Sequence, residues 1–446
     1  MPRVNTSNSW KKVPIKNLYL GLYDGPHATP KPSLSGPIFL GIKNITEDGR
    51  LDLSQIRNIS EDDFPKWTKR VLPTEGDIVF SYEATLNLYA MIPKGFRGCL
   101  GRRLALIRPD TEIVNPKFLY YSFFGEEWRN TISKNLISGA TVDRIPLINF
   151  PNFEVSIPIH SIQRKIASIL SNYDNLIENN TRRIEILEQI AKLVYEEWFV
   201  KFRFPGHENV EMVSSELGEI PEGWKVEKLS ELVKTQYGYT ESATEEEIGP
   251  KFLRGKDINK QSYISWDEVP FCSISPEVLD KYLLKKGDIV VIRMADPGKV
   301  GIVETEVNAV FASYLIRLEI IKNIKPYYLF YFLQSDKFQN YVIAASTGTT
   351  RKSASAGVIT NIDLIIPPEY LLTLFEDKIG LLRKQLNILI NKNQNLRKTR
   401  DLLLPKLISG EIDVSDLDIS IRNEYQEHNI NFGEPQDEEG LRSKMG

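Results

Sequence analysis

The 446-residue sequence contains very little cysteine and histidine. Two cysteines, Cys99 and Cys272, cannot form a disulfide framework, and four scattered histidines cannot assemble a zinc cluster. No apolar run approaches the roughly 20 residues that a membrane-spanning helix requires. The N-terminus also lacks the apolar core of a secretory signal. We therefore expect a soluble, cytoplasmic protein that holds no metal ion.

Motifs of catalysis and cofactor binding are also missing. The nearest approach to a phosphate-binding loop, from Gly249 to Lys256, has the wrong glycine spacing and lacks the Ser or Thr that would hold magnesium. There is no dinucleotide-binding glycine motif and no nucleophile elbow. The only Pro-Pro pair is followed by Glu369 and not by an aromatic residue, so the signature of an amino-methyltransferase is absent. We predict that the chain is not an enzyme by itself and binds no cofactor.

Charge is nearly balanced overall but is unevenly distributed. The net charge is -3, and the last 36 residues, 411–446, carry -7 of it. Segments 1–159 and 369–410 carry +4 each, whereas 160–200 carries -1 and 201–368 carries -3. A contact with nucleic acid would therefore depend on local basic patches. The acidic segment 411–446 is predicted to be a disordered tail.

The sequence contains an internal repeat. Gly-Asp-Ile-Val at 76–79 recurs at 287–290, and Ile-Pro at 157–158 recurs at 366–367. Between these matches, the aromatic segment 115–121 corresponds to 325–331, and Ser-Gly-Ala-Thr at 138–141 corresponds to Ser-Thr-Gly-Thr at 346–349. Four matches in one order at an offset of about 210 residues indicate two similar halves.

Each half begins with a mixed segment typical of short strands and ends with a long helical pattern. The first pattern covers 160–200 and contains one 4–4 step, at Leu176-Asn180-Ile184, within its 4–3 repeat. The second covers 369–410, repeats without interruption, and is expected to end at Pro405 and Gly410. The predicted seam residues are Ile166, Tyr173, Asn180, Ile184, Leu187, Ile379, Leu386, Asn393, Leu396 and Leu403.

Each helix could pack alone on its own domain, but two heptad patterns of matching length favour pairing with each other. The asparagine in each seam would then fix the register. We predict an α+β fold with two similar heads, 1–159 and 223–368, separated by an antiparallel two-helix coiled coil about 60 Å long. An approximate two-fold axis would relate the halves, and 201–222 would be a linker.

Several short segments resemble one known family over essentially the whole chain to about Leu417. They are Tyr-Asp-Gly-Pro-His-Ala-Thr-Pro at 23–30, Glu-Glu-Trp-Phe-Val at 196–200, Phe-Arg-Phe-Pro-Gly at 202–206, Ile-Pro-Glu-Gly-Trp at 220–224 and Leu-Leu-Pro-Lys-Leu-Ile-Ser-Gly-Glu at 403–411. Together they make the sequence similar to the specificity (S) subunits of type I restriction-modification systems.

The resemblance implies that each head is a target recognition domain for one half of an asymmetric, bipartite site in double-stranded DNA. The helix pair would set the gap between the halves and dock two modification (methyltransferase) subunits. Two restriction subunits would add ATP-dependent translocation and cleavage. S-adenosylmethionine, ATP and magnesium would be bound by these partners. A two-headed adaptor that binds only proteins, or an orphan relative without partners, remains the alternative.

Candidate DNA contacts are basic and polar residues in loops, where Arg, Lys, Asn and Thr can reach bases or phosphates. For each of them a solvated surface position is the competing interpretation. In head one they are His27, Thr29, Lys31, Lys43, Asn44, Arg102, Arg103, Thr141 and Arg144. In head two they are Arg254, Lys256, Arg293, Lys299, Thr349, Thr350, Arg351 and Lys352.

Four residues have a specific structural alternative. Arg103 could form an internal ion pair, and Asp24 could cap the turn at Gly25. Trp198 and Phe199 could form an exposed patch for a partner subunit, or core where the first helix meets head two.

Overall fold

The computed structural model describes residues 10–137, 142–346 and 352–419. It divides into two units, one with the residues up to Leu176 and from Leu396 onward, the other with 177–395. Each unit therefore combines one head with part of both long helices. The sequence predicted the heads and the helices as successive segments. In the structure, the part of each long helix that lies in a unit buries its apolar side on the head of that unit.

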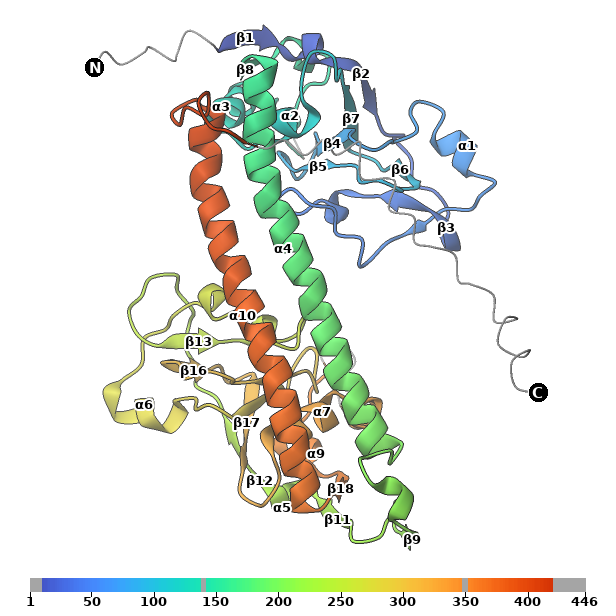
Figure 1. The fold of residues 1–446 in the computed structure, drawn as a ribbon, viewed down its shortest axis with the longest axis vertical. Coiled ribbons are helices and arrows are strands. Elements are labelled where there is room, and N and C mark those ends of the chain that lie inside the picture. Colours follow the sequence, from blue (N-terminus) through green and yellow to red (C-terminus); the bar gives the residue numbers. More distant parts are fainter. Residues whose placement is uncertain (1–9, 138–141, 347–351, 420–446) are drawn as a thin grey trace, which may run out of the picture. The chain divides into compact units, whose positions relative to one another are not determined.

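The two heads have the same order of strands, and α5 and α9 of head two lie where head one has the 3-10 turns Ile15–Leu18 and Phe150–Asn152 (Figure 1). Head one contains β1 (Lys11–Pro14), β2 (Tyr19–Asp24), β3 (Ser33–Leu40), α1 (Phe64–Trp67), β4 (Ile78–Ser81), β5 (Tyr89–Met91), β6 (Gly98–Leu100), β7 (Leu104–Pro109), α2 (Pro116–Ser122), α3 (Glu126–Lys134) and β8 (Glu154–Ile157). Head two contains β11 (Lys225–Lys228), α5 (Leu229–Leu232), β12 (Val233–Tyr237), β13 (Lys251–Leu253), α6 (Pro276–Tyr282), β14 (Ile289–Ile292), β15 (Val300–Ile302), β16 (Ala309–Phe311), β17 (Leu315–Ile320), α7 (Pro326–Gln334), α8 (Asp336–Ala345), α9 (Ala356–Thr360) and β18 (Asp363–Ile366).

The order and direction of strand pairing are the same in the two heads. A four-stranded antiparallel sheet has the order β2-β7-β4-β5 in head one and β12-β17-β14-β15 in head two. A parallel pair, β3-β6 or β13-β16, and an antiparallel pair, β1-β8 or β11-β18, accompany it. The predicted α+β fold and internal repeat are thus confirmed at the level of topology.

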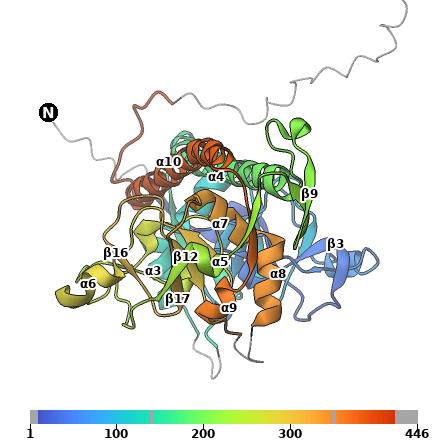
Figure 2. The ribbon, with the colours of Figure 1, turned by 90° about the horizontal axis from the view of Figure 1, so that it is seen from below.

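Both faces of the central sheet are buried. In β14, Ile289 and Val291 belong to one apolar cluster, while Val290 and Ile292 belong to another. This follows from the two-residue period of a strand, which sends alternate side chains to opposite faces. The larger cluster of head two also contains α7 and side chains of both long helices, so α7 lies between the sheet and the helix pair (Figure 2).

The long helices are α4 (His160–Tyr195), continued by a π-helical turn over Glu196–Val200, and α10 (Glu369–Ile408). In α4 the predicted 4–4 step at Asn180 is wrong. Leu176 is 53% exposed, whereas Ile177 is 3% exposed and takes its place in the seam. With Ile177 included, the seam of α4 keeps its 4–3 spacing through Asn180 and Ile184.

Within each unit the two helices run antiparallel. In unit 2, Ile184 packs with Leu389, and Phe199, further along α4, packs with Phe375, which comes earlier in α10. In unit 1, Ile166 shares its apolar cluster with Leu407. Of the other seam residues, Ile379 and Leu386 are buried, and Tyr173, Leu187, Leu396 and Leu403 are half-buried.

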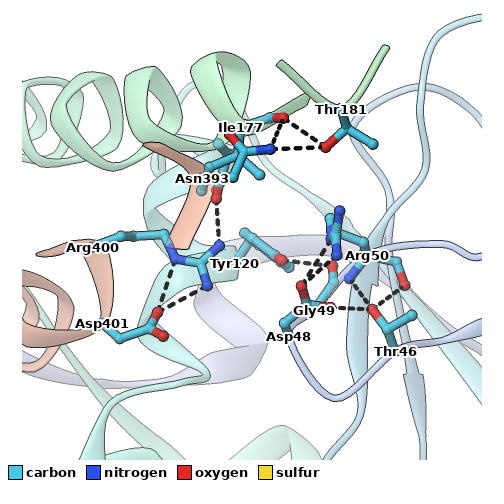
Figure 3. A network of polar contacts seen from close by, with 11 residues as sticks. Thr46, Asp48, Gly49, Arg50, Tyr120, Ile177, Thr181, Asn393, Arg400 and Asp401 are labelled. Atoms are coloured by element: carbon cyan, nitrogen blue, oxygen red, sulfur yellow. Dashed lines mark hydrogen bonds and ion pairs between the residues drawn. The ribbon is translucent and has the colours of Figure 1, made fainter. Parts of the chain in front are cut away.

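The two seam asparagines are hydrogen-bonded to each other. Asn180 Nδ2 donates to Asn393 Oδ1 at 2.9 Å, and both residues are buried. Asn393 Nδ2 donates in turn to the Ile177 carbonyl oxygen and to Thr181 Oγ1, both at 3.2 Å (Figure 3). Any other register would leave these amides buried without partners, which opposes slippage of the helices.

The end of α10 differs from the prediction. Pro405 lies inside the helix, which continues to Ile408, and Gly410 follows with a φ of +77°. Pro405 is tolerated because Leu407 and Ile408 are buried in the core of head one and hold the last turn in place. Gly410 supplies the left-handed residue that commonly follows a helix.

Two segments expected to lie outside the fold are packed against it. Val414, in the expected acidic tail, is buried in the cluster of head one, and Lys165 Nζ donates to the carbonyl oxygen of Ser415 at 2.6 Å. Residues 411–419 are therefore part of unit 1. The expected linker 201–222 contains the hairpin β9 (Met212–Ser215) and β10 (Gly218–Pro221), with Phe204 and Ile220 buried in the core.

A buried ion pair joins α10 to head two. Arg383 is 1% exposed and its guanidinium donates to both carboxylate oxygens of Glu304, from Nε at 2.8 Å and from Nη2 at 2.6 Å. Arg383 also donates to Ser262 Oγ and to the Ser262 carbonyl oxygen. In unit 1, Arg400 Nη1 of α10 bonds Asp174 Oδ1 of α4 at 2.6 Å.

We predict that Glu304→Gln destabilises unit 2 by about 3–5 kcal/mol, because it leaves the buried Arg383 charge without its carboxylate. The matched control is Glu231→Gln, which removes an exposed partner of Lys322 and should cost at most about 1 kcal/mol. Hydrogen exchange of unit 2 peptides, measured by mass spectrometry, gives the opening free energy. Equal protection in the two variants would contradict the prediction.

Glu376 gives unit 2 a pH-dependent stability. Burial raises the pKa of its carboxyl from 4.5 to about 7, although the carboxylate accepts the amide of Tyr327 at 3.0 Å. Between pH 4.5 and 7 the folded state retains a proton that the unfolded state releases. Unfolding free energy should therefore fall as pH rises through this window and level off above it. Glu376→Gln should lessen this fall in unfolding free energy. The control Glu216→Gln, which changes an exposed carboxylate, should not. Hydrogen exchange of unit 2 peptides at pH 5 and pH 8 measures the difference.

Candidate nucleic-acid interface

Three strand ends meet at one edge of the central sheet in each head. In head one, β2 and β4 end where β7 begins, because their neighbours in the sheet are antiparallel. The amide of Gly25 donates to the Leu104 carbonyl oxygen at 2.8 Å, and the amide of Tyr82 donates to that of Arg103 at 3.1 Å. We call this side of each head the loop edge.

Glycine is required where the first strand reaches the loop edge. A Cβ on Gly25 would lie 2.2 Å from the Gly101 carbonyl oxygen. The corresponding residue of head two is Gly238, where a Cβ would lie 2.3 Å from the Ala312 carbonyl oxygen. In both heads, therefore, the loops pack too closely for a side chain at this position.

In head one the loop edge carries a cluster of charges. Asp24 accepts from Arg70 Nη1 at 2.5 Å and contacts His27 Nε2 at 3.0 Å. The sequence had offered a cap on the turn at Gly25 as a structural role for Asp24. In the structure its carboxylate instead pairs with Arg70 and His27. Burial, with the negative charge of Asp24, raises the pKa of Tyr82 to about 12, so the phenol keeps its proton at neutral pH.

Two predicted arginines lie in the same cluster. Arg103, in the left-handed conformation with a φ of +69°, has its Nε 3.9 Å from Glu83 Oε1. This is a loose ion pair that leaves about a third of the side chain exposed. Arg144 is exposed, and its backbone pairs with that of Glu83, so both predicted arginines flank one acidic residue. Arg102, which directly precedes Arg103 in the sequence, is exposed as well.

The loop edge of head two combines aromatic rings with basic groups. The Arg293 guanidinium lies 4.9 Å from the centroid of the Tyr237 ring, and the Tyr237 hydroxyl accepts the amide of Ala356 at 3.1 Å. The amide of Ala295, two residues after Arg293, donates to the Lys352 carbonyl oxygen. At the positions of Asp24 and Glu83 in head one, head two therefore has Tyr237 and Met294, and its exposed acidic residue in this loop is Asp296.

The remaining exposed candidates lie in loops close to this edge. Thr29 and Lys31 are exposed in the loop after β2, and Lys299 is exposed just before β15. Lys43 and Lys256 are exposed in equivalent 3-10 turns, Ile42–Asn44 and Gly255–Asp257, that follow β3 and β13. Four predicted positions, Thr141, Thr349, Thr350 and Arg351, lie outside the described residues.

Two predicted contacts have polar groups that are engaged inside the fold, and of these the buried Asn44 is wrong, whereas the partly exposed Arg254 stays a prediction. Asn44 is 2% exposed; its Oδ1 accepts the Gly41 amide and its Nδ2 donates to the carbonyl oxygens of Asp52 and Gln55. Arg254 forms two hydrogen bonds to the Asp257 carboxylate, at 2.9 and 3.0 Å. Both residues organise the 3-10 turn in which they lie, a local contact that composition cannot distinguish from a surface role.

Sequence reasoning missed Arg70 and the tyrosines of this edge. Tyr237 corresponds to Asp24, as the residue before the close-approach glycine, and Tyr314 corresponds to Arg103, before the last central strand. Aligning the two repeats on these glycines would have brought both tyrosines into consideration.

Trp198 and Phe199 are both buried in the core of head two, so they are core residues and not an exposed patch for a partner subunit.

In the described ranges, no helix has the length and hydrophobicity to cross a bilayer. Nor do His, Cys, Asp and Glu form a group of three suited to a metal ion within the part of the chain that the structure covers.

Comparison with known proteins places the two repeats in one family. The family model for the type I restriction modification DNA specificity domain matches twice, at residues 29–189 and 221–371. The MjaIX specificity subunit of Methanocaldococcus jannaschii is 29% identical over 374 residues, covering 81% of this chain and 83% of the relative. The HindI specificity subunit of Haemophilus influenzae is 23% identical, covering 80% of this chain and 90% of the relative.

The fold is also similar to a solved one. The S subunit of a type I restriction-modification system from M. genitalium superposes with a TM-score of 0.54 at 17% identity, over 91% of this chain and 98% of that chain. With two matching domains that cover more than half of its length, this chain belongs to the family of type I restriction-modification specificity subunits.

Proposed function

We propose that this chain is the non-catalytic subunit that gives a type I restriction-modification complex its DNA sequence specificity. Each head reads one half of a bipartite, asymmetric site in double-stranded DNA. The helix pair sets the gap between the halves. The observation that carries the proposal is that the heads share one framework but differ at its loop edge, where Asp24 corresponds to Tyr237 and Arg103 to Tyr314. Two copies of one scaffold with different edges are suited to two different half-sites.

The outward faces of the helices support docking of partner subunits. In unit 2, large apolar side chains are exposed on both helices. They are Ile186, Ile190, Leu193, Leu374, Leu381 and Ile388. The spacing of 186, 190 and 193 and of 374, 381 and 388 places each set on one face of its helix, and a continuous exposed apolar face marks a surface for protein contact. We propose that two methyltransferase subunits bind the helix pair and that two restriction subunits join them in the cytoplasm. S-adenosylmethionine, ATP and magnesium would be bound by those partners.

The first test is the methylome of a host that carries the gene, with and without a disruption. The expected result is loss of one bipartite methylated motif, with two short halves around a degenerate gap. Restoring the gene is the control and should restore the motif. An unchanged methylome would contradict the proposal and favour the protein-only adaptor.

A second test changes the length of the helix pair. Inserting one heptad into α4 beside Asn180 and one into α10 beside Asn393 keeps the seam in phase. Seven helical residues add about 10 Å, so the gap should lengthen by about three base pairs. Both half-sites should stay the same. A control that replaces seven residues without changing length should leave the gap unchanged, and altered half-site bases would contradict this role.

A further inference from the structure

One position of the loop edge is built in the same way in both heads. Tyr82 directly follows β4, and its carbonyl oxygen accepts the amide of Ile145 at 2.8 Å. Arg293 directly follows β14, and its carbonyl oxygen accepts the amide of Ala354 at 2.9 Å. The same backbone position therefore carries a tyrosine in head one and an arginine in head two.

The residue whose backbone pairs with this position across the loop edge is of the other type in each head, an arginine in head one and a tyrosine in head two. The Tyr82 amide donates to the Arg103 carbonyl oxygen at 3.1 Å, and the Arg293 amide donates to the Tyr314 carbonyl oxygen at 2.9 Å. Each head thus pairs one arginine with one tyrosine at equivalent sites, in reversed order. We call these two pairs the Arg–Tyr pairs.

Backbone strain accompanies both pairs. Ala84 has a φ of +70° and Ala295 has a φ of +71°, a left-handed conformation that costs an alanine about 1–2 kcal/mol. Each lies two residues after the first member of its pair and is held by one hydrogen bond, to Asp143 or to Lys352. Strained residues that persist at equivalent places indicate a turn whose shape matters for function.

Unsatisfied polar atoms gather at the same place. Among the described residues, eight buried side-chain nitrogen and oxygen atoms lack a hydrogen-bond partner, and three of them belong to the Arg–Tyr pairs. They are Tyr82 Oη, Arg103 Nε and Arg293 Nε. A buried donor without a partner costs about 1–3 kcal/mol, which is a further sign of strain at this edge. Because the two Nε atoms are closed to solvent, a ligand would reach each arginine through its terminal Nη1 and Nη2 groups.

The surroundings indicate which acceptor suits these arginines. Glu83, with an oxygen 3.9 Å from Arg103 Nε, would repel a phosphate group but not an uncharged base. Arg293 packs over the face of the Tyr237 ring, which orients the guanidinium plane. The two parallel donors along one edge of a guanidinium match O6 and N7 of guanine in the major groove.

We propose that Arg103 and Arg293 are specificity-determining residues that each read one guanine, Arg103 in the half-site of head one and Arg293 in that of head two. This inference rests on the proposed function, because it names the readers within the same DNA site.

The test uses the complete complex, purified with its partner subunits, and measures methylation rates on DNA libraries randomised in both half-sites. Arg293→Gln should lower discrimination about 10- to 100-fold at a single G·C pair in one half-site. Arg103→Gln should do the same at one pair in the other half-site. Lys299→Gln and Arg102→Gln, which remove exposed cations near the same edges, should slow methylation of all sequences alike.

Two patterns of methylation would overturn the inference. One is a uniform loss of rate with an unchanged motif in both arginine variants, and the other is a change in the same half-site for both. Arg293→Lys, which keeps the charge but not the paired donors, should relax the same G·C pair as Arg293→Gln. If both Arg293 variants unfold unit 2 in hydrogen exchange, the residue is structural and the inference is wrong. Failure of the wild-type complex to methylate any bipartite motif would instead contradict the proposed function.

Discussion

The hydrogen bond between Asn180 and Asn393 is the constraint on which the rest of this architecture depends. An apolar seam alone would tolerate a slip by one heptad, because every seventh residue presents a similar surface. Two side-chain amides buried opposite each other oppose such a slip, because it would leave both without hydrogen-bond partners. The register of the pair decides which turns of α4 and α10 meet head two, and hence where Arg383 finds Glu304.

Each head is attached to the helices by polar contacts as well as by its core, and the chemistry differs between the units. In unit 2 the attachment is the buried pair of Arg383 and Glu304. In unit 1, Asp174 accepts from Arg400 and also from the Tyr121 hydroxyl. Buried ion pairs add little net stability but impose a strict geometry, because only one arrangement satisfies all the donors. Such contacts suit a protein in which the orientation of each head on its helices has to be exact.

The repeat separates framework from recognition. Strand order, the close-approach glycines and the strained alanines recur in both heads, whereas the side chains at the loop edge do not. Backbone geometry depends on hydrogen bonds and close packing, which restrict the choice of residue at few positions. The exposed side chains are free of those restrictions and can change with the DNA sequence that each head reads.

The sequence by itself determined the duplication, the two long helices and the asparagines of their seam, because periodicity and repeated motifs are properties of residue order. It could not distinguish Ile177 from Leu176, adjacent apolar residues of which only one faces the partner helix. Nor could it tell that Asn44 is buried and bonded to the carbonyl oxygens of Asp52 and Gln55, or that Val414 belongs to the core of head one. These were decided by the tertiary structure, since burial and hydrogen bonding depend on segments far apart in the chain that only folding brings together.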